Sequence, residues 1–307
     1  LQLPVYHEVY ASLVRQLWQA DGETVCRRLA SFGLWDRLPD LIDPSRDAYA
    51  VNQLARPRID PPADKEARSY AKQLLPVLSE AWPFDNCPPL CDVQLCQLAS
   101  LTDDSETFVR RGESALAYLN ANNQYREGYR LAKLAFERVA DPSPNTSRLI
   151  AGHISANAQS HDEIQQCHQL YSRTIAGLPE PTDARSAIEL GALLRDRANL
   201  SRRLGDIDTA LEDLQASLHH SEEHDLTRER AITLGEIARI KVDRGDIDAA
   251  LELHQEELSV YESLEDLRSR AVTLGDIARI KVSRGEVKAA LELHQERLRV
   301  HESFGDS

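Results

Sequence analysis

The chain has 307 residues, of which 42% are hydrophobic and 28% charged, and its formal net charge at pH 7 is -14. This composition excludes an intrinsically disordered chain, and the negative charge argues against nucleic-acid binding, which needs clustered cations to release phosphate counterions. No run of about 18 apolar residues occurs, so neither a transmembrane helix nor a membrane partner is expected. The five cysteines are scattered and odd in number, which favours a reducing, cytoplasmic location.

The N-terminal third shows short and irregular helical patterns. Residues 5–42 have apolar residues at helical spacing, and a proline-rich stretch near residues 43–62 predicts a linker or long loop. Helices are expected over residues 63–81 and 92–101. The predicted organisation is a degenerate helical N-terminal segment over residues 1–62, with the linker at its end, followed by a helical connecting segment over residues 63–106.

The C-terminal part contains an internal repeat with a period of 40 residues. From residue 231 to residue 266, 25 of the 36 positions are identical to the position 40 further on, and Gly245 aligns with Gly285. Each copy has two amphipathic patterns separated by an Arg-Gly-acid turn, which predicts a pair of helices. Gly245 can take the left-handed conformation that ends the first helix, and Asp246 is expected to cap the second with its carboxylate.

Weaker copies of the same pattern extend the array toward the N-terminus. The segment 205–211 differs from 245–251 at one position, and turns near residues 123 and 162 mark two more degenerate units. The repeat array is predicted to cover residues 107–307, with approximate units at 107–147, 148–190, 191–230, 231–270 and 271–307.

Small residues recur at fixed places in the two clearest copies. Ala238 and Ala278 lie in the first helix, and Ala250 and Ala290 lie early in the second. With the glycine at the turn, this pattern resembles the tetratricopeptide (TPR) family, in a long variety whose repeat exceeds the usual ~34 residues. The resemblance implies an all-α, right-handed superhelical solenoid of antiparallel helix pairs, which acts as a scaffold binding a protein or peptide and uses no cofactor.

The same resemblance implies that one face of each first helix lines a concave surface that holds the partner. The residues expected on this face are Arg110, Glu113, Asn120, Arg195, Asn199, Arg202, Arg203, Arg239, Asp243, Arg279 and Ser283. Arginines dominate it, so an acidic partner or one with a free carboxylate is expected, because guanidinium binds carboxylate through two parallel hydrogen bonds. The alternative is that Arg239 and Arg279 pair with Glu236 and Asp276 one turn back on the same helix.

Histidine and cysteine groupings give weaker signals. His254 and His294 stand at equivalent repeat positions, and a recent duplication explains their identity more simply than a ligand site does; both are expected to be partly packed between helices. The spacing of a complete metal site is missing, so no metal is expected. The two groupings weighed for this were His220 with His224, and Cys87 with Cys91 and Cys96.

No enzyme is expected in this chain, because it has no phosphate-binding loop, nucleophile elbow or HExxH zinc motif. The chain lacks methionine and ends where a further repeat would begin, so we expect the sensing or interaction region of a larger signalling protein. Two alternatives remain open: a peptide-sensing regulatory domain, or an array that restrains a catalytic domain of the nucleotide-hydrolase or protease type in cis. The exposed end of the array could also drive dimerisation.

Overall fold

The computed structural model describes residues 8–10, 35–39, 47–51, 64–81, 89–102 and 104–305. The chain divides into two compact units, Leu1–Asn157 and Ala158–Ser307, which are treated separately below. This division differs from the boundaries predicted after residues 62 and 106, which stay predictions. Cys87 and most of the predicted linker at 43–62 lie outside the described residues.

The N-terminal unit contains a small antiparallel sheet that the sequence analysis did not predict. Its strands are β1 (Glu8–Tyr10), β2 (Trp35–Pro39) and β3 (Asp47–Val51), in the order β1-β3-β2. In the register, Tyr49 of β3 lies opposite Val9 on one side and Arg37 on the other. The helical prediction for residues 5–42 is therefore wrong at β1 and β2, and so is the helical character predicted for the segment 1–62 at these strands. The third strand, β3, lies inside the predicted linker. Short apolar runs are ambiguous between helix and strand, and here pairing with β3 decided the outcome.

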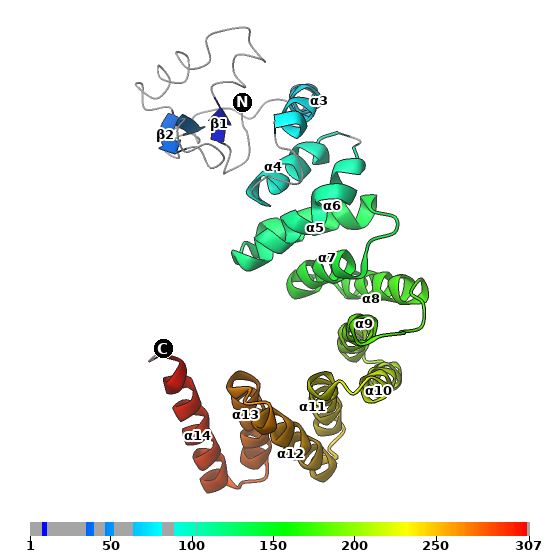
Figure 1. Ribbon diagram of the computed structural model, residues 1–307, viewed down its shortest axis with the longest axis vertical. Helices are drawn as coiled ribbons and strands as arrows, with labels where there is room; N and C mark the ends of the chain where they lie inside the picture. Colours follow the sequence, from blue (N-terminus) through cyan, green and yellow to red (C-terminus); the bar gives the residue numbers. More distant parts are fainter. Residues whose placement is uncertain are drawn as a thin grey trace. The chain divides into compact units, whose positions relative to one another are not determined.

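Among the described residues of the N-terminal unit, five helices follow the sheet; they run from α3 to α7 in Figure 1. They are α3 (Asp64–Ala81), α4 (Pro89–Ser100), α5 (Glu106–Ala121), α6 (Tyr125–Arg138) and α7 (Pro144–Asn157). Consecutive helices pack against one another, and α5 also contacts α7. A buried ion pair joins α5 to α4, because Arg111 donates to Asp92 across 2.7 Å and both side chains are shielded from solvent.

The C-terminal unit consists of seven helices that pack in chain order, ending with α14, drawn in red in Figure 1. They are α8 (His161–Ala176), α9 (Ala184–Leu204), α10 (Ile207–Glu223), α11 (Thr227–Asp243), α12 (Ile247–Ser263), α13 (Leu267–Ser283) and α14 (Val287–Gly305). The first helices of the three clearest repeats are α9, α11 and α13, and the second helices are α10, α12 and α14. The break predicted near residue 162 lies slightly earlier, since Ser160 caps α8.

The turns inside the helix pairs have the predicted backbone conformation. Gly205, Gly245 and Gly285 all have positive φ, between 76° and 84°, which glycine adopts without a Cβ clash. The predicted cap at Asp246 is wrong: its carboxylate accepts no backbone N–H of α12 and pairs with the Lys241 ammonium at 3.1 Å. Its counterpart Asp206, which has no lysine partner of this kind, does accept the Thr209 N–H at 3.1 Å.

The predicted small residues lie in the packed interior of the C-terminal unit. Ala238, Ala250, Ala278 and Ala290 are all buried, and larger side chains there would push the helices apart. One hydrophobic cluster of this unit contains Leu251 of α12 with Ile277 and Ile280 of α13. The predicted fold class, a TPR-like solenoid of antiparallel helix pairs, is confirmed for the helices, and the short sheet is an addition to it.

Candidate functional site

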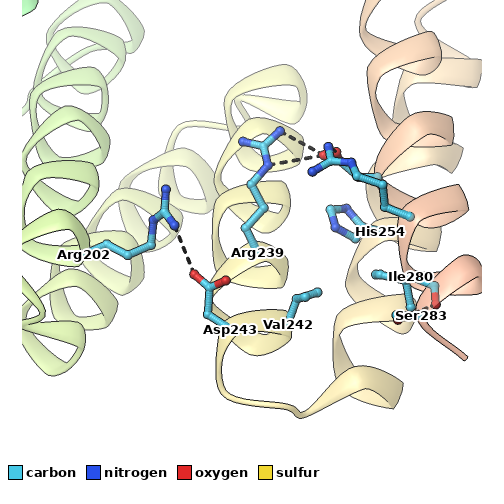
Figure 2. A pocket seen from close by; sticks show the side chains of 9 residues that line it. Arg202, Arg239, Val242, Asp243, His254, Ile280 and Ser283 are labelled. Carbon is cyan, nitrogen blue, oxygen red and sulfur yellow. Dashed lines mark hydrogen bonds and ion pairs between the residues drawn. The ribbon is translucent and has the colours of Figure 1, made fainter. Parts of the chain in front are cut away.

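A cavity of about 340 Å³ opens on the surface formed by the first helices α9, α11 and α13. Figure 2 shows the side chain of Arg202 on α9 reaching across to Asp243 on α11, with Arg239 next to them. The cavity is near the lower end of the size range of small-ligand pockets. Its lining consists of Arg202, Arg239, Val242, Asp243, His254, Asp276, Arg279, Ile280 and Ser283.

Ion pairs between consecutive first helices span this cavity. Arg202 Nη1 lies 3.0 Å from Asp243 Oδ2, and Arg239 donates to Asp276 Oδ2 from both Nε and Nη2, at 3.2 and 3.0 Å. Asp276, which is nearly buried, also accepts from Arg279 one turn further along α13. The arginines therefore connect one repeat to the next.

The predicted same-helix pairs are also present, so the pairing alternative is confirmed for Arg239 and Arg279, and their role in a partner surface stays a prediction. Arg239 pairs with Glu236, and Arg279 pairs with Asp276. Burial alone would lower the pKa of Arg239, but the carboxylates of Glu236 and Asp276 outweigh it and raise the pKa above its ordinary value. Arg239 is therefore held in its charged form.

Arginines outnumber carboxylates among the residues that line the cavity, and Arg239 also pairs with Glu236 outside this lining. Three guanidinium groups face two carboxylates, those of Asp243 and Asp276. The Arg279 side chain is 78% exposed and its one recorded ion pair uses a single nitrogen, although a guanidinium carries five N–H donors. Donors for an incoming carboxylate are thus available at this arginine.

His254 forms the buried side of the cavity lining. It is 1% exposed, and its Nδ1 lies 2.8 Å from Glu257 Oε2 in a pair that is itself buried. The prediction of a packed inter-helix histidine is confirmed here, whereas the identical His294 on α14 is exposed. The sequence analysis did not assign His254, Asp276, Val242 or Ile280 to the partner surface, because it considered the first helices one at a time.

Five of the eleven predicted residues line the cavity, and the other three on α9 do not. Arg195 lies against Glu229 at 2.5 Å and within hydrogen-bonding reach of Ser217, so it holds α9 to α10 and α11. Asn199 and Arg203 are exposed on α9 outside the cavity lining.

The three predicted residues on α5 belong to the N-terminal unit. Arg110 is exposed and pairs with Glu106 on its own helix, and Asn120 is exposed. Glu113 instead has a structural contact, because its carboxylate accepts hydrogen bonds from Ser143, Asn145 and Thr146 at the start of α7. Burial alone would raise the pKa of Glu113, but these hydrogen bonds outweigh burial and lower it.

The histidine and cysteine groupings noted in the sequence lie, except for Cys87, within the described residues. Within them, no group of three or more His, Cys, Asp or Glu side chains could hold a metal ion, and Cys87 lies outside them. His220 and His224 stand at the end of α10, where His220 lies 3.8 Å from Glu223. None of the described helices is both long enough and apolar enough to cross a membrane.

Comparisons with known proteins agree with this architecture. The family model described as tetratricopeptide repeat matches residues 229–303, which span nearly all of α11–α14. The solved structure of a STAND protein with a tetratricopeptide repeat sensor from Pyrococcus horikoshii is similar, with 13% identity, a TM-score of 0.50, and coverage of 97% of this chain but 43% of that one.

Aspartyl phosphate phosphatase F from Bacillus subtilis is similar at 15% identity and a TM-score of 0.50, over 83% of this chain and 68% of that one. At these identities the similarity shows the fold alone. No curated protein matches the chain. The predicted resemblance is therefore confirmed, and residues 229–303 are tetratricopeptide repeats.

Proposed function

We propose that this repeat scaffold binds another protein or a peptide, and that the cavity between α9, α11 and α13 receives a carboxylate of that partner. The observation that carries the proposal is the exposed guanidinium of Arg279 in a cavity lining that contains three arginines and two aspartates. A carboxylate placed there gains two parallel N–H···O bonds, which a single fixed charge could not provide.

The apolar part of the lining supports a peptide over a free anion. Val242 and Ile280 stand beside the arginines and belong to the hydrophobic cluster between α12 and α13. A peptide side chain next to the bound carboxylate would cover the partly exposed Val242 and exclude water from the ion pairs, which strengthens those pairs. The proposal thus combines a charged anchor with apolar contact area.

We further propose that this chain is cytoplasmic and has no catalytic activity of its own. It serves as the sensing or interaction region of a larger signalling protein. The name of the Pyrococcus horikoshii protein describes its tetratricopeptide repeats as a sensor, and an equivalent role here fits a surface built to recognise a partner. Substrate turnover by the purified chain would contradict this part of the proposal.

The test measures binding of two peptide libraries that differ only in having a free or an amidated C-terminus. Acidic side chains are added to both libraries as a second variable. Arg279→Gln should weaken binding of carboxylate-bearing peptides about tenfold, because it removes an exposed donor without disturbing the core. Arg268→Gln is the matched control, since Arg268 is exposed on the same helix and outside the cavity lining. Equal binding by both variants would place recognition elsewhere.

A further inference from the structure

The helix α14 presents an apolar and basic face that is exposed, although the same face of the preceding repeat is covered. We call this the α14 face, and it consists of Val287, Lys288, Leu291, His294 and Leu298. Leu291 is 56% exposed, whereas its counterpart Leu251, 40 residues earlier on α12, is 7% exposed. Val287 and Leu298 are likewise more than half exposed.

The earlier repeats show what normally covers this face. On α12, Leu251 is packed by Ile277 and Ile280 of the following first helix, α13. One repeat earlier, Leu211 of α10 packs in the same way against Ile237 and Ile240 of α11. The face is therefore shaped for a helix with two apolar residues three positions apart.

A surface ion pair accompanies this apolar contact in both earlier repeats. Asp208 on α10 pairs with Arg244 at 2.6 Å, and Asp248 on α12 pairs with Arg284 at 2.8 Å. Each arginine lies four residues after the second apolar contact residue of its helix. At the equivalent position of α14 the charge is reversed, because Lys288 replaces the aspartate.

A second position on α14, where the side chain reaches back to Gly275 of α13, shows the same change of sign. Glu257 of α12 is buried beside His254, and its counterpart on α14 is Arg297, which is exposed. A second copy of α14 carries Lys288 rather than a carboxylate at the equivalent position. A further repeat with an arginine at its turn would meet Lys288 with like charge. Neither occupant therefore offers Lys288 an opposite charge at that position.

We propose that the α14 face binds an amphipathic helix of another protein, with two apolar residues three positions apart and a carboxylate four residues beyond the second. The apolar pair would cover Leu291 and its neighbours as Ile277 and Ile280 cover Leu251. The carboxylate of the partner would pair with Lys288. This contact corresponds to the pair between Arg284 and Asp248, but the positive charge is now on the covered helix. This surface is separate from the cavity, so the proposal is independent of the proposed function.

The helix α13 supplies the probe for the test. A fluorescent peptide with the sequence of residues 266–285 carries the apolar pair and Arg284, and a second peptide carries Arg284→Glu. Anisotropy titration with the full chain should show binding of the Glu peptide about three to ten times tighter than the Arg peptide, because one ion pair replaces one repulsion. The Lys288→Asp variant should reverse this preference.

Two further variants locate the binding. Leu291→Asp should abolish binding of both peptides by placing a charge in the apolar contact. Gln295→Asp is the control with the same change of charge, because Gln295 and its counterpart Gln255 are both exposed and lie off the covered face. Circular dichroism should confirm equal helix content in the variants.

Several results would overturn the proposal. These are equal affinity for the two peptides, binding that survives Leu291→Asp, and no binding of either peptide at millimolar concentration. A dimer in sedimentation experiments that dissociates on Leu291→Asp would assign the α14 face to a second copy of the chain.

Discussion

Two glycines at the same repeat position should respond in opposite ways to alanine. Gly235 on α11 and Gly275 on α13 stand in nearly identical helical sequences, and each faces a charged side chain of the following helix. A Cβ on Gly235 would lie 2.6 Å from Oε1 and 2.8 Å from Cδ of Glu257. A Cβ on Gly275 would lie 2.7 Å from Nη1 of Arg297.

The size of each stability change depends on how freely the charged side chain, Glu257 or Arg297, can move away from the new methyl group. Alanine gains about 0.8–1 kcal/mol over glycine inside a helix. Glu257 is buried and held by His254, so displacing it costs about 2–3 kcal/mol in overpacking and weakened hydrogen bonding. Gly235→Ala should therefore destabilise the protein by about 1–2 kcal/mol. Arg297 is exposed and its flexible end can move, so Gly275→Ala should stabilise by up to about 1 kcal/mol.

The assay is urea unfolding of the full chain followed by circular dichroism, combined with hydrogen exchange. Exchange is needed because stacked repeats can unfold in parts, and the loss in Gly235→Ala should appear in α11 and α12. Equal changes in stability for the two variants would refute the reasoning, since it depends on the different freedom of Glu257 and Arg297.

Three other predictions concern contacts that hold the helices in place. Asp213→Ala should destabilise by about 3 kcal/mol in urea unfolding, because Arg197 makes a two-pronged pair with this nearly buried carboxylate. The pKa of Glu113 is lower in the folded than in the unfolded protein, so its carboxylate stabilises the fold fully above the unfolded pKa. This stabilisation is lost as the pH falls through the folded pKa. Glu113→Gln should therefore make the thermal unfolding temperature less sensitive to acid below about pH 4.5. Glu265 has a φ of 55°, so Glu265→Gly should stabilise by about 1 kcal/mol, while Gly285→Ala at a φ of 76° should destabilise by a similar amount, both measured by thermal unfolding. Changes in the same direction for these two variants would contradict the backbone argument.

Local signals predicted the repeat array well. The 40-residue identity and the glycines at the turns are local features of one helix pair, so they can be recognised without knowing what packs on the pair. The N-terminal part was predicted poorly because its apolar runs are short. Residues 8–10 and 35–39 become strands only through pairing with β3, which is a non-local contact.

In the candidate site, contacts within one helix were predicted from the sequence, and contacts between helices were not. The sequence placed Arg239 and Arg279 on one face of their helices and identified their same-helix partners, since a spacing of three residues fixes that contact. It could not show that Arg239 also reaches Asp276 on α13, or that Arg195 turns away to Glu229. Those contacts depend on how far one helix lies from the next.

The sequence by itself determined the helix pairs, their turns and the residue types on each face, because these follow from periodicity and backbone preference. Only the tertiary structure decided which equivalent residues differ in environment. His254 is buried beside Glu257 while the identical His294 is exposed, and Leu251 is covered while Leu291 is not. The physical reason is that burial is a property of the neighbouring helix, and a repeat copied in sequence does not carry its neighbours with it.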